Sequence, residues 1–60
     1  MQREDIIQTM IETVNVYNTN LMKQAKLSQE DITKNIDSQY PALYHMFGLV
    51  YEDLEAKGVF

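Results

Sequence analysis

The side chains able to do chemistry are few in this chain. His45 is the only histidine, and the chain has no cysteine. A histidine acts as a general base or metal ligand only with further groups at suitable spacing. On a helix, His45 shares one face with Glu52, seven residues later, and with no nucleophile or second ligand. We therefore expect a solvated His45, no enzymatic activity, and no metal or cofactor.

Asn18 is the second polar residue that stands out, because it lies near the centre of an apolar helical stripe. If this helix pairs with another, Asn18 occupies a buried heptad position, where a polar residue fixes register and oligomeric state. Alternatively, Asn18 lies at a local kink or bonds a backbone group of its own chain. The sequence leaves both interpretations open.

Asn18 belongs to the first of three helices that the apolar pattern predicts. This helix covers residues 4–26, with two acidic residues in its first turn and two lysines in its last. Both sets of charges suit the helix dipole. Residues 15–20 include three asparagines, which form helices poorly, so a kink is possible there.

Two further helices are expected after the first. Ser28 is a typical N-cap, so a short helix begins there. It ends near residues 37–39, because Tyr40 precedes Pro41 and is disfavoured in the α conformation. Pro41 suits the first turn of a third helix, which Gly58 terminates. The sequence therefore predicts an all-α three-helix bundle with a long, a short and a long helix.

Length and composition indicate that this bundle needs a partner. Sixty residues lie near the lower limit for an unaided hydrophobic core. Neither disulfides nor a zinc site can be built from this composition. We expect residues 1–60 to form one small domain that homo-oligomerisation completes, most simply as a homodimer. The interface expected from the first stripe consists of Ile7, Ile11, Val14, Asn18 and Leu21.

The acidic balance of the chain restricts its partners. A net charge of −4 and a pI near 4.6 oppose attraction to nucleic acid and to anionic membranes. They favour a protein partner with a basic surface. No apolar run has the length of a membrane span, and the N-terminus lacks a secretory pattern. We therefore expect a complete small cytoplasmic protein that does not bind membranes.

The third helix carries the expected partner-binding residues. Tyr44 and Tyr51 lie at one edge of its apolar stripe, and aromatic side chains are enriched at protein interfaces. Glu52 and Glu55 follow, and their charge suits a basic partner. Core packing and ordinary solubility charge are the other interpretations of these residues. The first hypothesis is a small acidic, non-enzymatic protein that binds a larger protein and modulates or inhibits it, as phage-encoded or regulatory inhibitors of this size do.

Residues 27–60 also resemble a winged-helix or helix-turn-helix DNA-binding segment. Residues 27–32 (LSQEDI) are similar to the start of the first motif helix, and residues 54–60 (LEAKGVF) to a recognition helix passing into a wing. The resemblance implies a DNA-binding transcription regulator as the alternative function. The corresponding recognition helix, residues 41–57, has no arginine, one lysine and three acidic residues. Phosphate contacts need basic side chains, so protein binding remains the first hypothesis.

Overall fold

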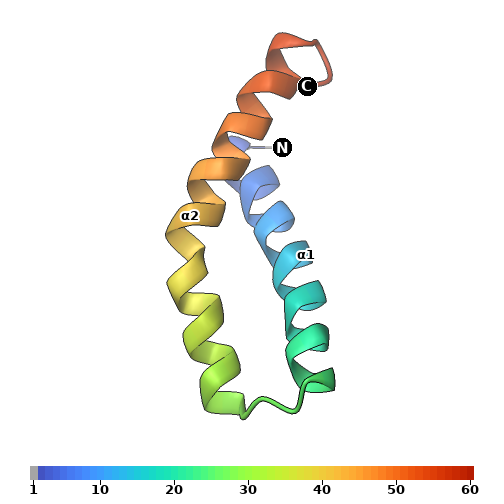
Figure 1. Cartoon of the computed structure of the whole chain (residues 1–60). Helices are drawn as coiled ribbons and strands as arrows, with labels where there is room; N and C mark the ends of the chain where they lie inside the picture. The colour runs from blue at the N-terminus through green and yellow to red at the C-terminus, as the bar shows by residue number, and fades with distance from the viewer. Residues whose placement is uncertain (1) are drawn as a thin grey trace.

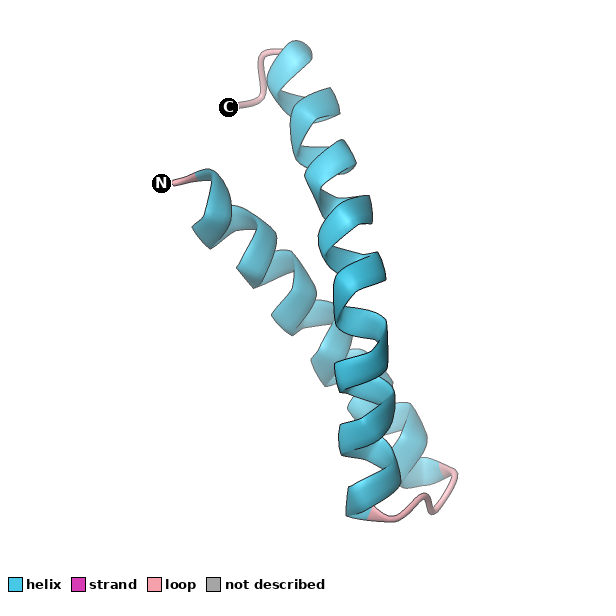
Figure 2. Cartoon of the chain, turned by 90° about the vertical axis from the view of Figure 1, so that its left-hand side faces the viewer, coloured by secondary structure: helices cyan, strands magenta, loops and turns pink. Residues whose placement is uncertain are grey.

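A computed structural model describes residues 2–60 as two antiparallel helices joined by a short turn (Figure 1). Helix α1 is Arg3–Gln24 and helix α2 is Gln29–Ala56. Residues 2–60 contain no strand, so the expected all-α class is confirmed. The hairpin measures 42 × 18 × 16 Å, and the end of α2 extends past the start of α1 (Figures 1 and 2).

The second and third helices expected from the sequence are one continuous helix, so the prediction of a three-helix bundle is wrong. Pro41 lies inside α2. Its missing N–H leaves the Asp37 carbonyl without the usual helical donor, but this removes only one hydrogen bond. The residue before a proline is disfavoured in the α conformation and not excluded from it. Continuity is favoured by packing, since Ile32 before Pro41 and Tyr51 after it are both buried.

The hydrophobic core lies between the two helices and is small. Ile7, Ile11 and Tyr51 form its centre. Ile7 and Ile11 are four residues apart and so lie on the same face of α1. Leu43 and Phe47 of α2 pack against them and are half-buried. Only part of each apolar stripe is covered by the opposite helix.

The turn between the helices begins with a Schellman motif. The Leu27 amide donates to the Met22 carbonyl at 3.1 Å, and the Lys26 amide donates to the Lys23 carbonyl at 3.0 Å. Lys26 has φ 63°, in the left-handed region that glycine usually occupies. Helix α1 therefore ends at Gln24, two residues before the expected end.

The end of α2 uses the same motif with glycine. Gly58 has φ 79°, and the Val59 amide donates to the Leu54 carbonyl at 3.0 Å. Gly58 thus stops the helix as expected from the sequence. The reversal carries the chain back, so that the Phe60 ring stacks on Tyr51 with centroids 5.1 Å apart.

Ser28 begins α2, as its residue type predicts. Its Oγ accepts a hydrogen bond from the Asp31 amide at 3.1 Å. Ser28→Ala is expected to lower the free energy of unfolding by about 1 kcal/mol, because that amide loses its acceptor. Urea unfolding followed by circular dichroism measures the change. Ser38→Ala, the same replacement inside α2, is the control and is expected to be neutral or slightly stabilising.

Candidate functional site

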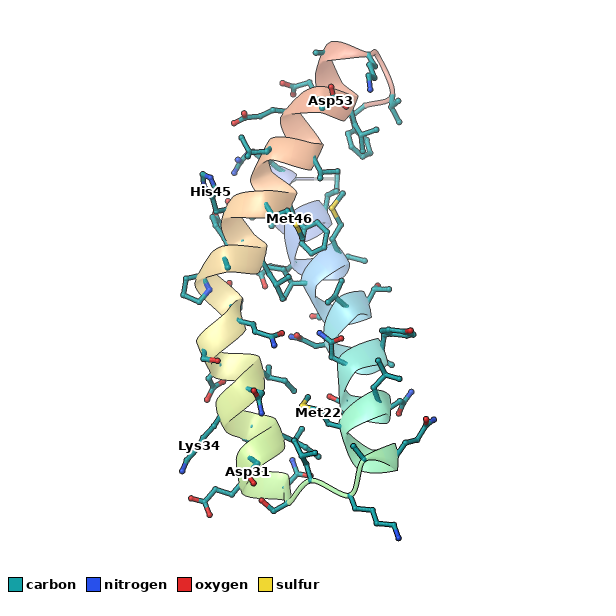
Figure 3. The ribbon with its side chains drawn as sticks, in the orientation of Figure 1. Met22, Asp31, Lys34, His45, Met46 and Asp53 are labelled. Carbon is teal, nitrogen blue, oxygen red and sulfur yellow. The ribbon has the colours of Figure 1, made fainter. Side chains whose placement is uncertain are left out.

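His45, the side chain considered for catalysis, and the hydroxyl group of Ser28 lie far apart in different surroundings. His45 is exposed and lies on the side of α2 remote from α1 (Figure 3). Ser28 caps the N-terminus of α2, at the end of the hairpin that contains the turn. Within residues 2–60, no group of three or more His, Cys, Asp and Glu side chains could hold a metal ion. His45 and Ser28 therefore do not form a joint site in the hairpin.

Arg3 organises the end of the hairpin opposite the turn. Its guanidinium lies over the Tyr51 ring, 5.7 Å from the ring centre, and 3.8 Å from the Glu52 carboxylate. Gly48 permits this approach, since a Cβ at that position would lie 3.2 Å from Arg3 Nη2. Arg3 thus ties the first turn of α1 to the last third of α2.

Tyr44 is fixed by a second contact between the helices. Its hydroxyl donates to the Glu4 carboxylate at 2.5 Å. This hydrogen bond raises the pKa of the Tyr44 phenol above its ordinary value of 10.0. Tyr44 therefore remains protonated at neutral pH and keeps donating to Glu4.

The four expected partner-binding residues have different environments in the hairpin. Tyr51 is 9% exposed, so nearly all of its ring serves the core. Tyr44 is half-buried, while Glu52 and Glu55 are exposed. The structure brings Tyr44, Tyr51 and Glu52 together around Arg3 and Glu4. The exposed charged side chains there are the Arg3 guanidinium and the carboxylates of Glu4 and Glu52.

The five expected oligomer-interface residues are divided by the hairpin. Ile7 and Ile11 are buried against α2, within one chain. Val14 and Asn18 are half-buried, and Leu21 is 46% exposed. Asn18 reaches across the hairpin, its Nδ2 donating to Gln39 Oε1 at 3.4 Å, and α1 runs unbroken through residues 15–20.

An apolar surface remains on one side of the hairpin. The apolar stripe of each helix has one edge that the opposite helix does not cover. Because successive side chains are 100° apart around a helix axis, these two uncovered edges lie on the same side of the antiparallel pair. Figure 3 shows Met46 on this near side of α2. Tyr17 is 65% exposed and Met46 46%, although both are large apolar side chains. We call this surface the apolar face, and it consists of Met10, Val14, Tyr17 and Leu21 from α1 and Leu43, Met46, Val50 and Leu54 from α2.

An open groove continues the apolar face beyond Met10. It has a volume of about 520 Å³ and is lined by Ile6, Thr9, Met10, Tyr51 and Phe60. No protein-family model, curated protein or solved structure matches the chain. Function must therefore be inferred from the apolar face, the groove and the charges around them.

Charge is distributed unevenly between the two halves of the hairpin. We call residues 2–13 and 41–60 the open half, and residues 14–40, which include the turn, the turn half. The open half has six acidic and two basic side chains, which accounts for the whole net charge of −4. The turn half has three acidic and three basic side chains.

Within residues 2–60, neither helix has the apolar length needed to cross a membrane.

Sequence reasoning placed the stripes correctly but missed which part of each stays uncovered. Met10 and Tyr17 belong to the first stripe, yet the expected interface omitted both. The signal was present in the sequence, because Met10, Val14, Tyr17 and Leu21 are spaced by four, three and four residues, as in a heptad seam. No sequence pattern indicated the roles of Arg3 and Phe60, because both roles depend on which parts of the chain the fold brings together.

Proposed function

We propose that this chain is a small acidic, non-enzymatic helical protein that acts by association: it forms a homodimer, and the dimer binds a larger protein and modulates its activity. The apolar face is the observation that carries the proposal. Exposed apolar surface that extends across two helices is typical of protein–protein contact sites. Its side chains can bury a large apolar area in a contact, and they carry no reactive group.

The accessible surface of the hairpin supports association. A compact monomer of 7.0 kDa exposes about 4000 Å², whereas this hairpin exposes 4464 Å². The excess follows from pairing only two helices, which leaves one side of each without a neighbour. A second protein surface on the apolar face removes that excess and supplies the core that sixty residues alone do not complete.

The acidic open half supports the second part of the proposal. With the apolar face covered, the surface left for a larger partner is polar, and its net charge is concentrated in the open half. Such a surface attracts a basic partner and accelerates encounter. Glu52 and Glu55 lie on the exposed side of this half.

A charge-neutralisation experiment tests the partner-binding part. A pull-down with the purified chain, followed by mass spectrometry, supplies the candidate partner. Glu52→Gln with Glu55→Gln is then expected to slow association about tenfold at low salt and to flatten its salt dependence. Stopped-flow or surface-based kinetics measure both effects.

The matched control removes two charges from the other half of the hairpin. Glu30→Gln with Asp37→Asn lowers the acidic count equally but leaves the open half unchanged. At 0.1 M salt, where screening limits the reach of exposed charges to about 10 Å, its association rate is expected to change less than that of the first double variant. Equal effects of the two double variants would contradict docking through the open half.

The DNA-binding alternative receives no support from the hairpin. A helix-turn-helix motif needs two helices joined by a sharp turn, but α2 is continuous where the resemblance would place that turn. Residues 2–60 contain no strand that could form a wing. We therefore do not propose DNA binding.

A further inference from the structure

Two copies of a hairpin with one apolar face can meet in parallel or antiparallel orientation. We propose that a second copy of this chain docks on the apolar face in antiparallel orientation, with the open half of each copy against the turn half of the other and α1 against α1. The inference rests on the homodimer proposed above and specifies its geometry. Two independent observations carry it, namely spacing and charge.

The spacing of apolar residues on α1 suits antiparallel self-pairing. Met10, Val14, Tyr17 and Leu21 have intervals of four, three and four residues, which read the same in both directions. In an antiparallel pair centred between residues 15 and 16, Met10 faces Leu21 of the second copy, and Val14 faces Tyr17. Each layer then combines a longer or aromatic side chain with a branched aliphatic one, as efficient packing requires.

The charge distribution discriminates between the two orientations. In a parallel dimer the two open halves, each with a net charge of −4, lie side by side. Like charges brought together at an interface repel each other and oppose that arrangement. In the antiparallel dimer each open half lies against a turn half with three acidic and three basic side chains, which has no net charge. The charges therefore favour the antiparallel orientation.

The outline of the hairpin sets an upper limit on the area of such a dimer. Its broad side measures 42 × 18 Å, roughly 750 Å² in outline, against the ~800 Å² per partner of standard interfaces, and a pair centred between residues 15 and 16 covers only part of it. The groove beside Met10 adds depth at one end. In the antiparallel pair Leu21 of the second copy lies opposite Met10, which lines this groove. The second copy thus places an apolar side chain beside the hollow of the first.

Disulfide trapping tests the orientation, and the lack of native cysteine makes it specific. Met10→Cys and Leu21→Cys are prepared as single variants, checked for helicity by circular dichroism, and oxidised alone and as an equimolar mixture. The antiparallel dimer predicts a mixed disulfide as the main product and little disulfide in either variant alone. Val14→Cys with Tyr17→Cys provides a second pair with the same expected pattern.

The control is Val16→Cys. Val16 lies on the opposite side of α1, and its side chain is 63% exposed. This variant is expected to form no more disulfide than free diffusion produces. Sedimentation equilibrium of the unmodified chain separates the two proposals. A monomer at all concentrations overturns both the homodimer and this geometry. A dimer whose single variants form disulfides with themselves, or whose mixtures form none, overturns the antiparallel arrangement alone.

Discussion

Replacing Ile7 with alanine is expected to remove most of the stability of the hairpin. Ile7 is 0% exposed and packs with Ile11 and Tyr51 in a core of very few side chains. Isoleucine-to-alanine changes in cores cost about 2–5 kcal/mol, while a folded chain of this length has only about 3–9 kcal/mol in total. Urea unfolding at a fixed chain concentration measures the loss.

Val16→Ala is the matched control for this prediction. Val16 is also β-branched and also lies in α1, but its side chain is 63% exposed. Its replacement is expected to change the free energy of unfolding by no more than about 0.5 kcal/mol. If Ile7→Ala and Val16→Ala unfold at the same urea concentration, Ile7 is not in the core of the molecule.

Replacing Pro41 with alanine is expected to stabilise the hairpin by up to about 3 kcal/mol. Proline inside a helix costs about that amount relative to alanine. Pro41 is exposed, so little apolar contact is lost with its ring. Alanine restores an N–H for the Asp37 carbonyl. Thermal unfolding is expected to show a rise in midpoint of roughly 4–8 °C for each kcal/mol gained by a chain of this size.

His45→Ala controls for the general benefit of alanine in a helix. His45 is exposed in α2, four residues after Pro41, and has an ordinary backbone N–H. Its replacement is expected to stabilise the hairpin by no more than about 0.7 kcal/mol. A Pro41→Ala variant that is less stable than the parent would show that the proline ring, and not a continuous hydrogen-bond ladder, sets the path of α2.

Local chemistry predicted the helix boundaries at which a single side chain decides the outcome. Ser28 can accept the Asp31 amide whatever the rest of the chain does, and the structure has that hydrogen bond. Gly58 tolerates a positive φ at little cost, and it has one. Ile7 and Ile11 were recognisable as a helical face because their spacing of four follows the helical period.

Pro41 could not be placed by local rules because the competing terms come from opposite ends of the chain. Its local preference favours a helix start, but burial of Ile32 and Tyr51 favours one continuous helix. Lys26 shows the same limit, since its φ of 63° is imposed by the reversal between helices. The width of the apolar stripes was visible in the sequence, whereas the half that the opposite helix covers depends on how the two helices cross (Figure 2).

The four-residue turn has a consequence for the rate at which the molecule forms. Residues 25–28 close the hairpin over a very short loop, and chains of ten residues already close in about 10–100 ns. All packing between elements lies across this one connection. Helical chains with such local contacts fold in microseconds to milliseconds. Two protein molecules associate with rate constants of about 10⁵–10⁷ M⁻¹s⁻¹. At micromolar concentration this corresponds to roughly 0.1–10 encounters per second, which is far slower than folding. Each newly made hairpin is therefore folded, with its apolar face exposed, well before it meets another protein molecule at such a concentration.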